Sequence, residues 1–479
     1  MADPRTNLLH GMKEPTPARR IFWLILFFGV SVITILLGNF SLFAAFLFAL
    51  VAFIAALVYA QGGILLLAAC SFFSTIGIYF SQYEWSRRIP YLNAVDAPVV
   101  DFIAAFLVVT TLCALMTHIT SIPAQRKKLV LHLCLLYGAF LLVGVVASVH
   151  AFDYRVFESL YALIRKPAFV FAAYVLLPLV VLRKEEAMQQ LFRIWFWVGL
   201  FAALFGLSSL VVAQSGDVFR VQPYTFWGIT PFGFNHNVLA EVLVTVLPIS
   251  LYVVLQKQLH EAAWKQRLYQ WGTGIIFIAS LLTLSRAAWI VVATLAGFVL
   301  YHSPEYRKKT SAYWQAYKPI LVSIALLLVG YMGFFLVSHT AQSSTASRLL
   351  TTDIVSYMVT RSPFIGYGPG MYIPVLEQTR AFTMDFGDPL DAHGYIQKVL
   401  LEYGVLGLVL FTACLGYILV FLYKKYRAAE HGEQRLLYQT MFLMAVAAIG
   451  FQLFNTSYFS SVMWLPLGVA LAVVTKKDN

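Results

Sequence analysis

The sequence has few charged residues. Only 12% of its 479 residues are Asp, Glu, Lys or Arg, about half the share that is typical of soluble globular chains, whereas 60% are hydrophobic and the mean hydropathy is +0.76. This deficit excludes a soluble multidomain enzyme and a disordered protein. The long apolar runs also lack the alternating pattern of outer-membrane barrel strands. The sequence therefore predicts an all-α polytopic integral membrane protein.

Cysteines are also few, and the common catalytic and metal-binding motifs are missing. The four cysteines (Cys70, Cys113, Cys134 and Cys414) lie within apolar runs, which predicts neither a disulfide nor a zinc site. The sequence contains no Walker A, GxSxG or HExxH motif, and we expect no metal and no cofactor. The net charge of +12 does not indicate a nucleic-acid partner, because Lys and Arg lie mostly in short loops between apolar runs.

The apolar runs predict about 12–14 transmembrane helices, given that a span needs ~20 apolar residues. The candidate spans are 21–38, 41–59, 63–80, 98–117, 129–149, 167–182, 191–212, 237–255, 269–285, 287–301, 319–338, 397–423, 436–453 and 457–475. Alternation from a cytoplasmic N-terminus places most of the lysines in inner segments, as the positive-inside rule requires. We therefore expect a multi-pass membrane protein with both termini in the cytoplasm.

This topology divides the chain into six parts. They are a cytoplasmic N-terminal tail (1–20), N-terminal transmembrane helices (21–212), central transmembrane helices (213–338) with an external loop (213–237), a large external region with short helices (339–396), C-terminal transmembrane helices (397–475) and a cytoplasmic tail (476–479).

Arginine predominates among the basic residues predicted to lie outside. These residues are Arg87, Arg88, Arg155, Arg165, Arg220, Arg286, Arg348, Arg361 and Arg380, together with Lys166 and Lys398. The planar guanidinium fork suits bidentate capture of phosphate, which predicts an anionic substrate on this face. The alternative for each single arginine is an ion pair with an external carboxylate such as Asp153 or Asp217.

Three external regions contain the candidate site residues. In the first, 213–237, Arg220 precedes a helix for which Asn235 or Asn237 is the predicted N-cap, and a capped N-terminus attracts anions. His236 and Glu241 lie near that helix start, and structural hydrogen bonding is the favoured interpretation for both. In the second, TLSRAAW, Arg286 lies where two helices meet at the edge of the apolar core. A snorkelling arginine is the alternative there.

The third region runs from His339 to Tyr395. It contains SRLLTTDIVSYMVTRSPFIGYGPGMY, in which apolar residues at helical spacing precede a turn at IGYGPG, and then DAHGYIQKVLLEYGVLGLVLF. His393 stands just ahead of a predicted helix, with Gln397 one turn later on the same face. A histidine at this position can act as a general base near neutral pH, or it can be structural.

Taken together, these elements resemble the shared core of the O-antigen ligase and O-antigen polymerase superfamily. The resemblance covers roughly residues 215–425. It rests on RVQPYTFWGITPFGFNHNVLAEVL, on TLSRAAW, and on the SR-led helix with its P-x-x-G-x-G-x-G turn and the His-containing stretch ahead of L-x-E-x-G-x-x-G.

The resemblance implies an inverting, metal-independent membrane glycosyltransferase of the GT-C type, whose donor is a glycan on undecaprenyl pyrophosphate. It also implies a place in the bacterial inner membrane, with the active site on the periplasmic or outer face. The family's essential histidine falls on His393 and its two essential arginines fall on Arg220 and Arg286. Where the family commonly has Asn after the histidine, this chain has Gly394. Arg348, Arg361, His236 and Gln397 are further candidates for contacts with the pyrophosphate or the glycan.

We therefore expect an O-antigen ligase that acts in lipopolysaccharide biosynthesis and transfers a glycan to a hydroxyl of lipid A-core, with the lipid bilayer as its environment. An O-antigen or exopolysaccharide polymerase with a glycan acceptor uses the same chemistry and stays open, as does a protein O-oligosaccharyltransferase. A transporter is the alternative from another class.

Overall fold

A computed structural model describes most of the chain after its first two predicted spans. The described residues are 60–73, 76–79, 96–116, 122–213, 219–226, 229–256, 263–302, 322, 326, 330–331, 333–334, 337–379, 381–387, 394–430, 432–455 and 458–476. The predicted spans 21–38 and 41–59, most of span 319–338, and His393 lie outside them.

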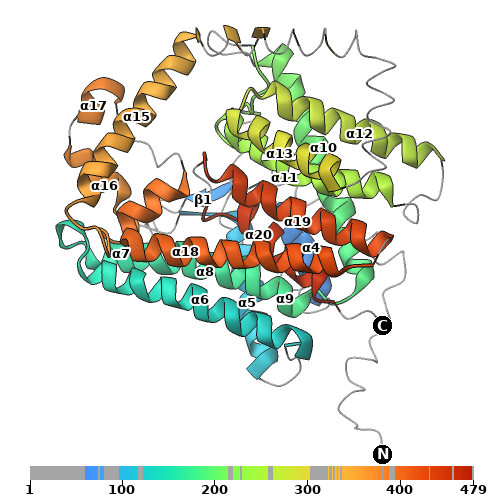
Figure 1. The fold of residues 1–479 in the computed structure, drawn as a ribbon, viewed down its shortest axis with the longest axis horizontal. Coiled ribbons are helices and arrows are strands. Elements are labelled where there is room, and N and C mark those ends of the chain that lie inside the picture. The colour runs from blue at the N-terminus through green and yellow to red at the C-terminus, as the bar shows by residue number, and fades with distance from the viewer. Residues whose placement is uncertain are drawn as a thin grey trace, which may run out of the picture.

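The structure is a bundle of α-helices (Figure 1). Its helices are α4 (Ala60–Cys70), α5 (Val99–Met116), α6 (Ala124–Val149), α7 (Val156–Leu163), α8 (Phe169–Phe171), α9 (Leu177–Val181), α10 (Glu185–Val212), α11 (His236–Leu255), α12 (Ala263–Leu282), α13 (Arg286–His302), α15 (His339–Val359), α16 (Tyr372–Gln378), α17 (Ala381–Phe386), α18 (Tyr395–Ala428), α19 (Glu433–Phe451) and α20 (Ser461–Val474). A short 3₁₀ helix spans Phe152–Tyr154, and two π-helical segments, η6 (Ile164–Ala168) and η7 (Ala172–Leu176), separate α7, α8 and α9.

Six described helical segments are long and apolar enough to cross a membrane. They are Val99–Met116, Ala124–Val149, Val156–Val181, Glu185–Val212, His236–Leu255 and Tyr395–Ala428, and two shorter apolar helices are Arg286–His302 and Ser461–Val474. The predicted all-α polytopic membrane fold is confirmed. The total of about 12–14 spans stays a prediction, since several of them lie outside the described residues.

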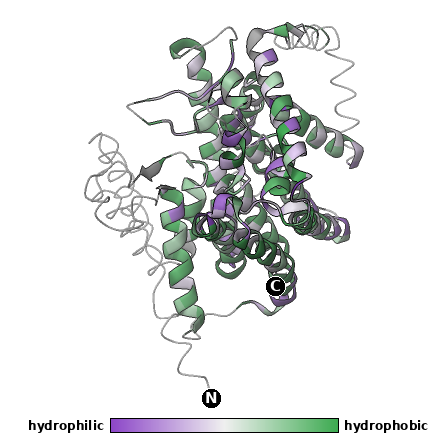
Figure 2. Cartoon of the chain, turned by 90° about the vertical axis from the view of Figure 1, so that its left-hand side faces the viewer, coloured by the Kyte–Doolittle hydropathy of each residue, from purple (hydrophilic) through white to green (hydrophobic). Residues whose placement is uncertain are grey.

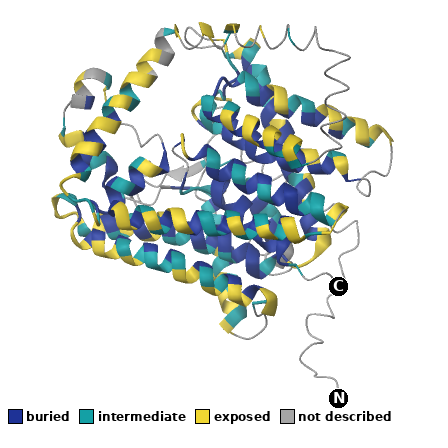
Figure 3. Cartoon of the chain, viewed as in Figure 1, coloured by how far each residue is buried: buried dark blue, intermediate teal, exposed yellow. Residues whose placement is uncertain are grey.

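The centre of the bundle is formed by α11, α19 and α20, which Figure 3 shows largely buried. Every side chain of α20 is buried, and α11 packs against α10, α12 and α19. A helix that is apolar on all sides is suited to such an interior position. These three helices provide the rigid frame on which the external loops are held.

The peripheral helices expose apolar side chains. On α6, Leu135 and Leu142 are exposed, as is Val409 on α18, and Figure 2 shows hydrophobic residues covering most of the helices. Such surfaces are unfavourable in water and favourable against lipid tails. The outer faces of these helices are therefore the surfaces that meet the bilayer.

Contacts between helix ends divide the bundle into two opposite ends. At one end, the amide of Val221 donates to the carbonyl of Leu282 over 2.9 Å, and the amide of Tyr395 donates to the carbonyl of Gln452 over 3.1 Å. At the other end, the ammonium of Lys476 lies 2.6 Å from the carboxylate of Glu185. These contacts join segments at each end of the bundle, and the side of the membrane that each end faces stays a prediction.

A buried arginine joins three helices near the second end. Arg126 of α6 is 1% exposed, and its two Nη atoms donate to the carbonyl of Leu179 over 2.6 Å and to the carbonyl of Ala472 over 2.8 Å. These carbonyls belong to the last turns of α9 and α20, where backbone carbonyls have few hydrogen-bond partners within the helix. The guanidinium therefore caps two helix ends at once.

The predicted span 63–80 is wrong beyond Cys70. The helix α4 ends there, and a short strand β1 (Gly77–Tyr79) pairs antiparallel with β2 (Asp96–Pro98). The carbonyl of Ser71 accepts a hydrogen bond of 2.6 Å from the hydroxyl of Ser461. This contact with α20 satisfies a backbone group at the helix end, so the helix can stop inside an apolar stretch.

The prediction that Arg165 and Lys166 lie in an external loop is also wrong. Both residues lie within η6, inside the continuous helical segment Val156–Val181. Pro167 interrupts the regular hydrogen bonding of a helix, and the π-helical turns around it keep the segment continuous. The carbonyl of Pro167 accepts a hydrogen bond of 3.1 Å from the hydroxyl of Tyr137.

Candidate active site

Arg220 lies in an extended segment, residues 219–226, that is held on both sides. The neighbouring Val221 is fully buried, and its amide donates to the carbonyl of Leu282 at the end of α12. Four residues after Arg220, the ring of Tyr224 stacks on Phe205 of α10 with ring centroids 4.3 Å apart. The backbone of Arg220 is therefore fixed between the ends of α10 and α12.

The helix that follows begins with a capped turn. The side chain of Asn235 accepts hydrogen bonds from the amides of Asn237 (2.9 Å) and Val238 (3.1 Å), so the predicted cap is Asn235. His236 is then the first residue of α11. Helix dipoles give this position a partial positive charge of roughly half a unit, which favours an anion.

Arg286 is the first residue of α13, at the helix junction that the sequence predicted. The connection from α12 is short, and Leu284 within it has a positive φ of 55°. The Nη1 atom of Arg286 donates to the hydroxyl of Thr345 on α15 over 3.3 Å. The arginine thus points from a second helix N-terminus towards α15.

One face of α15 carries three polar residues of the site. Thr345, Arg348 and Thr352 follow one another at three- and four-residue spacing, which places them on the same side of the helix. Thr345 contacts Arg286, and the hydroxyl of Thr352 accepts a hydrogen bond of 2.7 Å from the side-chain amide of Gln397 at the start of α18. This face therefore joins the start of α13 to the start of α18, with Arg348 between them.

Arg348 is partly buried on this face. Its Nε atom is enclosed and makes no hydrogen bond within the described part of the chain. Burial lowers the pKa of Arg348 below its usual value, and the positive charge of Arg286 lowers it further. An arginine next to a like charge, with an unused donor, is poised to bind an anion.

The three arginines converge on His236. Arg220, Arg348 and Arg286 all lie within electrostatic range of its imidazole, each from a different element. Gathering three guanidinium groups costs Coulomb energy that a bound polyanion would offset. The structure therefore brings together four of the seven residues that the sequence proposed, and we call them the arginine cluster: Arg220, His236, Arg286 and Arg348.

Arg361 lies apart from the arginine cluster. It is exposed beyond the end of α15, its guanidinium lies 4.8 Å from the ring centroid of Tyr357, and it donates a hydrogen bond to the hydroxyl of that residue. The thirteen residues from Arg348 to Arg361 correspond to roughly 20 Å of helical rise. The structure thus ranks Arg348 above Arg361, which the sequence could not separate.

Glu241 has a structural environment. It is fully buried on α11, and its carboxylate accepts hydrogen bonds from the side-chain amides of Gln452 (2.5 Å) and Asn455 (2.6 Å) beyond the end of α19. The structural interpretation of this residue is therefore supported. Sequence inspection missed Gln452 and Asn455, because nothing in their local pattern links them to α11.

The turn IGYGPG crosses the first part of α18. The amides of Tyr367 and Gly368 donate to the carbonyls of Leu401 and Glu402, both over 2.9 Å. A Cβ on Gly366 would lie 2.6 Å from the backbone of Glu402. The glycine-rich turn and the L-x-E-x-G-x-x-G segment therefore form one packed crossing.

The crossing also supports a buried ion pair. Lys398 and Glu402 are both buried, with 3.8 Å between ammonium and carboxylate, and Glu402 accepts a hydrogen bond of 3.3 Å from the amide of Tyr372. Lys398, which the sequence counted among the external basic residues, is thus paired inside this crossing.

His393 lies outside the described residues, but the residue after it is fixed. Gly394 has a φ of 140°, and a Cβ there would lie 2.5 Å from the carbonyl oxygen of Leu453. Tyr395 follows and donates its amide to the carbonyl of Gln452. Gly394 is therefore the residue that this contact requires, which gives a physical reason for its departure from the Asn of the family pattern.

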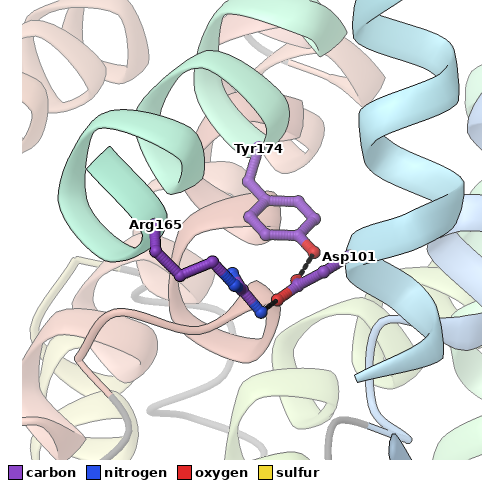
Figure 4. A network of polar contacts seen from close by, with 3 residues as sticks. All are labelled: Asp101, Arg165 and Tyr174. Atoms are coloured by element: carbon purple, nitrogen blue, oxygen red, sulfur yellow. Dashed lines mark hydrogen bonds and ion pairs between the residues drawn. The ribbon is translucent and has the colours of Figure 1, made fainter. Parts of the chain in front are cut away.

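Two of the remaining external arginines pair with carboxylates. Figure 4 shows Arg165 and the hydroxyl of Tyr174 both bonded to Asp101, with 2.7 Å between the Nη2 of Arg165 and the carboxylate. Arg155 lies 3.5 Å from Glu158 and 3.9 Å from Asp153. The alternative of ion pairing holds for Arg155 and Arg165, which leaves the arginine cluster as the distinctive group.

A family model described as O-antigen ligase matches residues 271–412. This range contains Arg286, Arg348, the glycine-rich turn and the start of α18. Residues 271–412, which we call the O-antigen ligase domain, are similar to this family. The match confirms the resemblance to the O-antigen ligase superfamily that the motifs indicated, and it leaves Arg220 and His236 on the N-terminal side of the O-antigen ligase domain.

Two further comparisons add little. None of the curated proteins compared with the chain matches it. Among solved structures, a chain from a peptidoglycan synthase complex matches with 14% sequence identity and a TM-score of 0.38, covering 72% of this chain and 96% of that one. The family assignment therefore depends on the O-antigen ligase domain.

Proposed function

We propose that this membrane protein is a glycosyltransferase whose arginine cluster binds the pyrophosphate of an undecaprenyl-pyrophosphate-linked glycan. The observation that carries the proposal is the convergence of Arg220, Arg286 and Arg348 on His236, at the start of α11 and α13. The O-antigen ligase domain supports the same chemistry.

In the proposed reaction, the acceptor hydroxyl oxygen attacks the anomeric carbon of the donor glycan while the bond from that carbon to the pyrophosphate oxygen breaks. The arginines stabilise the charge that develops on the leaving pyrophosphate. His393 takes the proton of the acceptor hydroxyl or orients that hydroxyl. Attack opposite the leaving group inverts the anomeric configuration.

The preferred acceptor is lipid A-core, which makes the protein an O-antigen ligase. A polymerase that adds repeat units to a lipid-linked glycan is the second candidate, because the same domain and the same arginine cluster serve both reactions. Gln397, bonded to Thr352 on the α15 face of the cluster, is the residue that we expect to help to position the glycan.

The deciding experiment uses purified protein in detergent with undecaprenyl-pyrophosphate-linked glycan and EDTA. One reaction contains lipid A-core without O-antigen, and one contains no added acceptor. Wild type is compared with Arg286→Ala, Arg348→Ala and His393→Ala, and with Arg155→Ala as a control arginine that has carboxylate partners.

Transfer to lipid A-core that the three variants lose and Arg155→Ala keeps supports the ligase. Chain lengthening without added acceptor supports the polymerase. Full activity of Arg286→Ala and Arg348→Ala would remove the arginine cluster from the mechanism. Loss of activity with EDTA that added metal restores would refute the metal-independent reaction.

A further inference from the structure

A polar cavity of about 630 Å³ lies at the opposite end of the bundle from the arginine cluster. Its walls come from the start of α6, the second half of α18, the start of α19 and the end of α20. The lining residues are Gln125, Lys128, Leu129, His132, Tyr417, Phe421, Lys425, Tyr438, Thr475 and Lys476. The positive-inside rule predicts that this end faces the cytoplasm.

The charge of the lining has one sign. Lys128 of α6, Lys425 of α18 and Lys476 just beyond the end of α20 contribute three ammonium groups, and the lining contains no carboxylate. Lys476 also contacts Glu185 outside the lining, at 2.6 Å. The cavity is therefore electropositive and suits a phosphate group, since a compact ammonium is a point-charge donor to phosphate oxygens.

The lining of the cavity also contains neutral polar groups. The Nδ1 atom of His132 and the hydroxyl of Tyr417 share a hydrogen bond of 3.0 Å across the boundary between α6 and α18. This bond holds the two helices in register beside the lysines. A phosphate ester in the cavity would find hydroxyl groups as well as ammonium groups within one enclosure.

The cavity also borders an apolar surface. Leu129 and Phe421 form part of its lining, and the exposed side chains of Leu131 and Leu135 on α6 and of Val420 on α18 continue away from it. Exposed apolar side chains on a membrane helix lie against acyl chains. A ligand with a phosphate head and lipid tails therefore fits this site better than a soluble anion does.

The cavity is separate from the proposed active site. Lys425 lies 21 residues beyond the kink of α18 at Gly404, which corresponds to roughly 30 Å of straight helix. This distance excludes the possibility that a single pyrophosphate contacts both groups.

We infer that this cavity binds the phosphodiester headgroup of an anionic phospholipid of the cytoplasmic leaflet. The ammonium groups of Lys128, Lys425 and Lys476 hold the phosphate, and the acyl chains lie along the exposed faces of α6 and α18. Basic pockets between membrane helices are suited to such headgroups.

The test uses delipidated full-length protein in detergent, titrated with phosphatidylglycerol or with phosphatidylcholine of the same acyl chains. Native mass spectrometry measures the bound fraction of each lipid. We expect phosphatidylglycerol to bind at least roughly 20-fold more tightly, since Lys128 and Lys425 each contribute about fivefold in affinity for an anionic headgroup. Competition by inorganic phosphate at the same concentration separates a lipid site from a general phosphate site.

The variant Lys128→Gln/Lys425→Gln removes two lining charges, and we expect it to weaken phosphatidylglycerol binding by roughly 20-fold. Its matched control is Lys127→Gln/Lys424→Gln, which removes two neighbouring exposed lysines outside the lining and should change binding less than about twofold. Lys128→Arg/Lys425→Arg keeps the charge and should retain the binding.

Equal binding of the two lipids, or equal losses in the two Gln pairs, would overturn the inference. Displacement of phosphatidylglycerol by inorganic phosphate would also overturn it and would leave a soluble anion as the ligand. If Lys128→Gln/Lys425→Gln fails to fold, the single variants Lys128→Gln and Lys127→Gln are compared instead. We then expect phosphatidylglycerol binding to weaken about fivefold in Lys128→Gln and to stay unchanged in Lys127→Gln.

Discussion

Gly404 of α18 packs directly against the backbone carbonyl of Phe364, and a side chain at this position would collide with it. Gly404 has a φ of 65°, and the amides of Val405 and Leu406 turn away from α18 to donate to the carbonyls of Pro363 (2.8 Å) and Phe364 (3.2 Å). The helix therefore kinks where the glycine-rich turn crosses it. This kink sets the direction of the first turns of α18, which carry Gln397.

We expect Gly404→Ala to destabilise the protein and to lower transfer activity. The positive φ alone costs about 1–3 kcal/mol for a residue with a Cβ, and the collision with Phe364 adds to it. Thermal unfolding in detergent measures the first effect. Gly416→Ala is the control on the same helix, because a Cβ there meets nothing within 4 Å. An equal loss of stability in both variants would show that the crossing is not what requires Gly404.

The carboxylate of Glu241 should matter more for stability than that of an exposed glutamate. Glu241→Gln replaces an acceptor of two side-chain amide hydrogen bonds with a group that presents its own amide, which should cost about 1.5–3 kcal/mol. Thermal unfolding measures the effect, and Glu377→Gln, at an exposed position of α16, is the control. A wild-type unfolding temperature for Glu241→Gln would rule out a stabilising network between α11 and α19.

Arg348 should act on the leaving pyrophosphate as strongly as Arg286 does. We expect Arg348→Ala to lower kcat/KM by roughly 10²–10³-fold, the range seen when one preorganised donor to a developing anion is removed. Arg348→Lys should recover part of the activity, because it keeps the charge and loses the fork. Rates with undecaprenyl-pyrophosphate-linked glycan give the comparison. An effect no greater than that of Arg155→Ala would separate Arg348 from the reaction.

The contact between Asp101 and Arg165 should behave as a partly buried ion pair. Removing one partner leaves the other charge uncompensated, and we expect Asp101→Leu to cost about 1.5–3 kcal/mol. The double variant Asp101→Leu/Arg165→Leu should be more stable than either single variant, because no charge then stays unpaired. Thermal unfolding of the four proteins gives the coupling. Additive losses would contradict the pairing, and loss of transfer activity without loss of stability would indicate a proton-relay role.

Local features of the site were predictable from the sequence. Asn235 caps α11 and Arg286 begins α13, because capping and helix junctions depend on neighbouring residues. The long spans were also predictable, since an apolar run of sufficient length forms a helix in lipid. The end of α4 at Cys70 was not, because the contact that satisfies it comes from Ser461 on α20.

The relative importance of the arginines required the tertiary structure. Arg348 and Arg361 are thirteen residues apart and equally basic, yet only Arg348 lies on the face of α15 that meets Arg286 and Gln397. Arg165 was predicted to lie outside because it precedes the predicted span 167–182, whereas it lies within the continuous helical segment Val156–Val181. Such distinctions depend on contacts between segments that are far apart in the chain. The spacing of residues in the sequence gives no information about these contacts.

The cap formed by Arg126 has a consequence for biogenesis. One of its two carbonyl partners, Ala472, is 346 residues away on the last helix. During synthesis, α6 is made long before α20. Until α20 is present, one donor of the Arg126 guanidinium has no Ala472 carbonyl to bind and contacts water or lipid headgroups instead. Insertion of the final helix then withdraws this charge from solvent. A chain that ends before α20 therefore lacks one of the two carbonyl partners of Arg126.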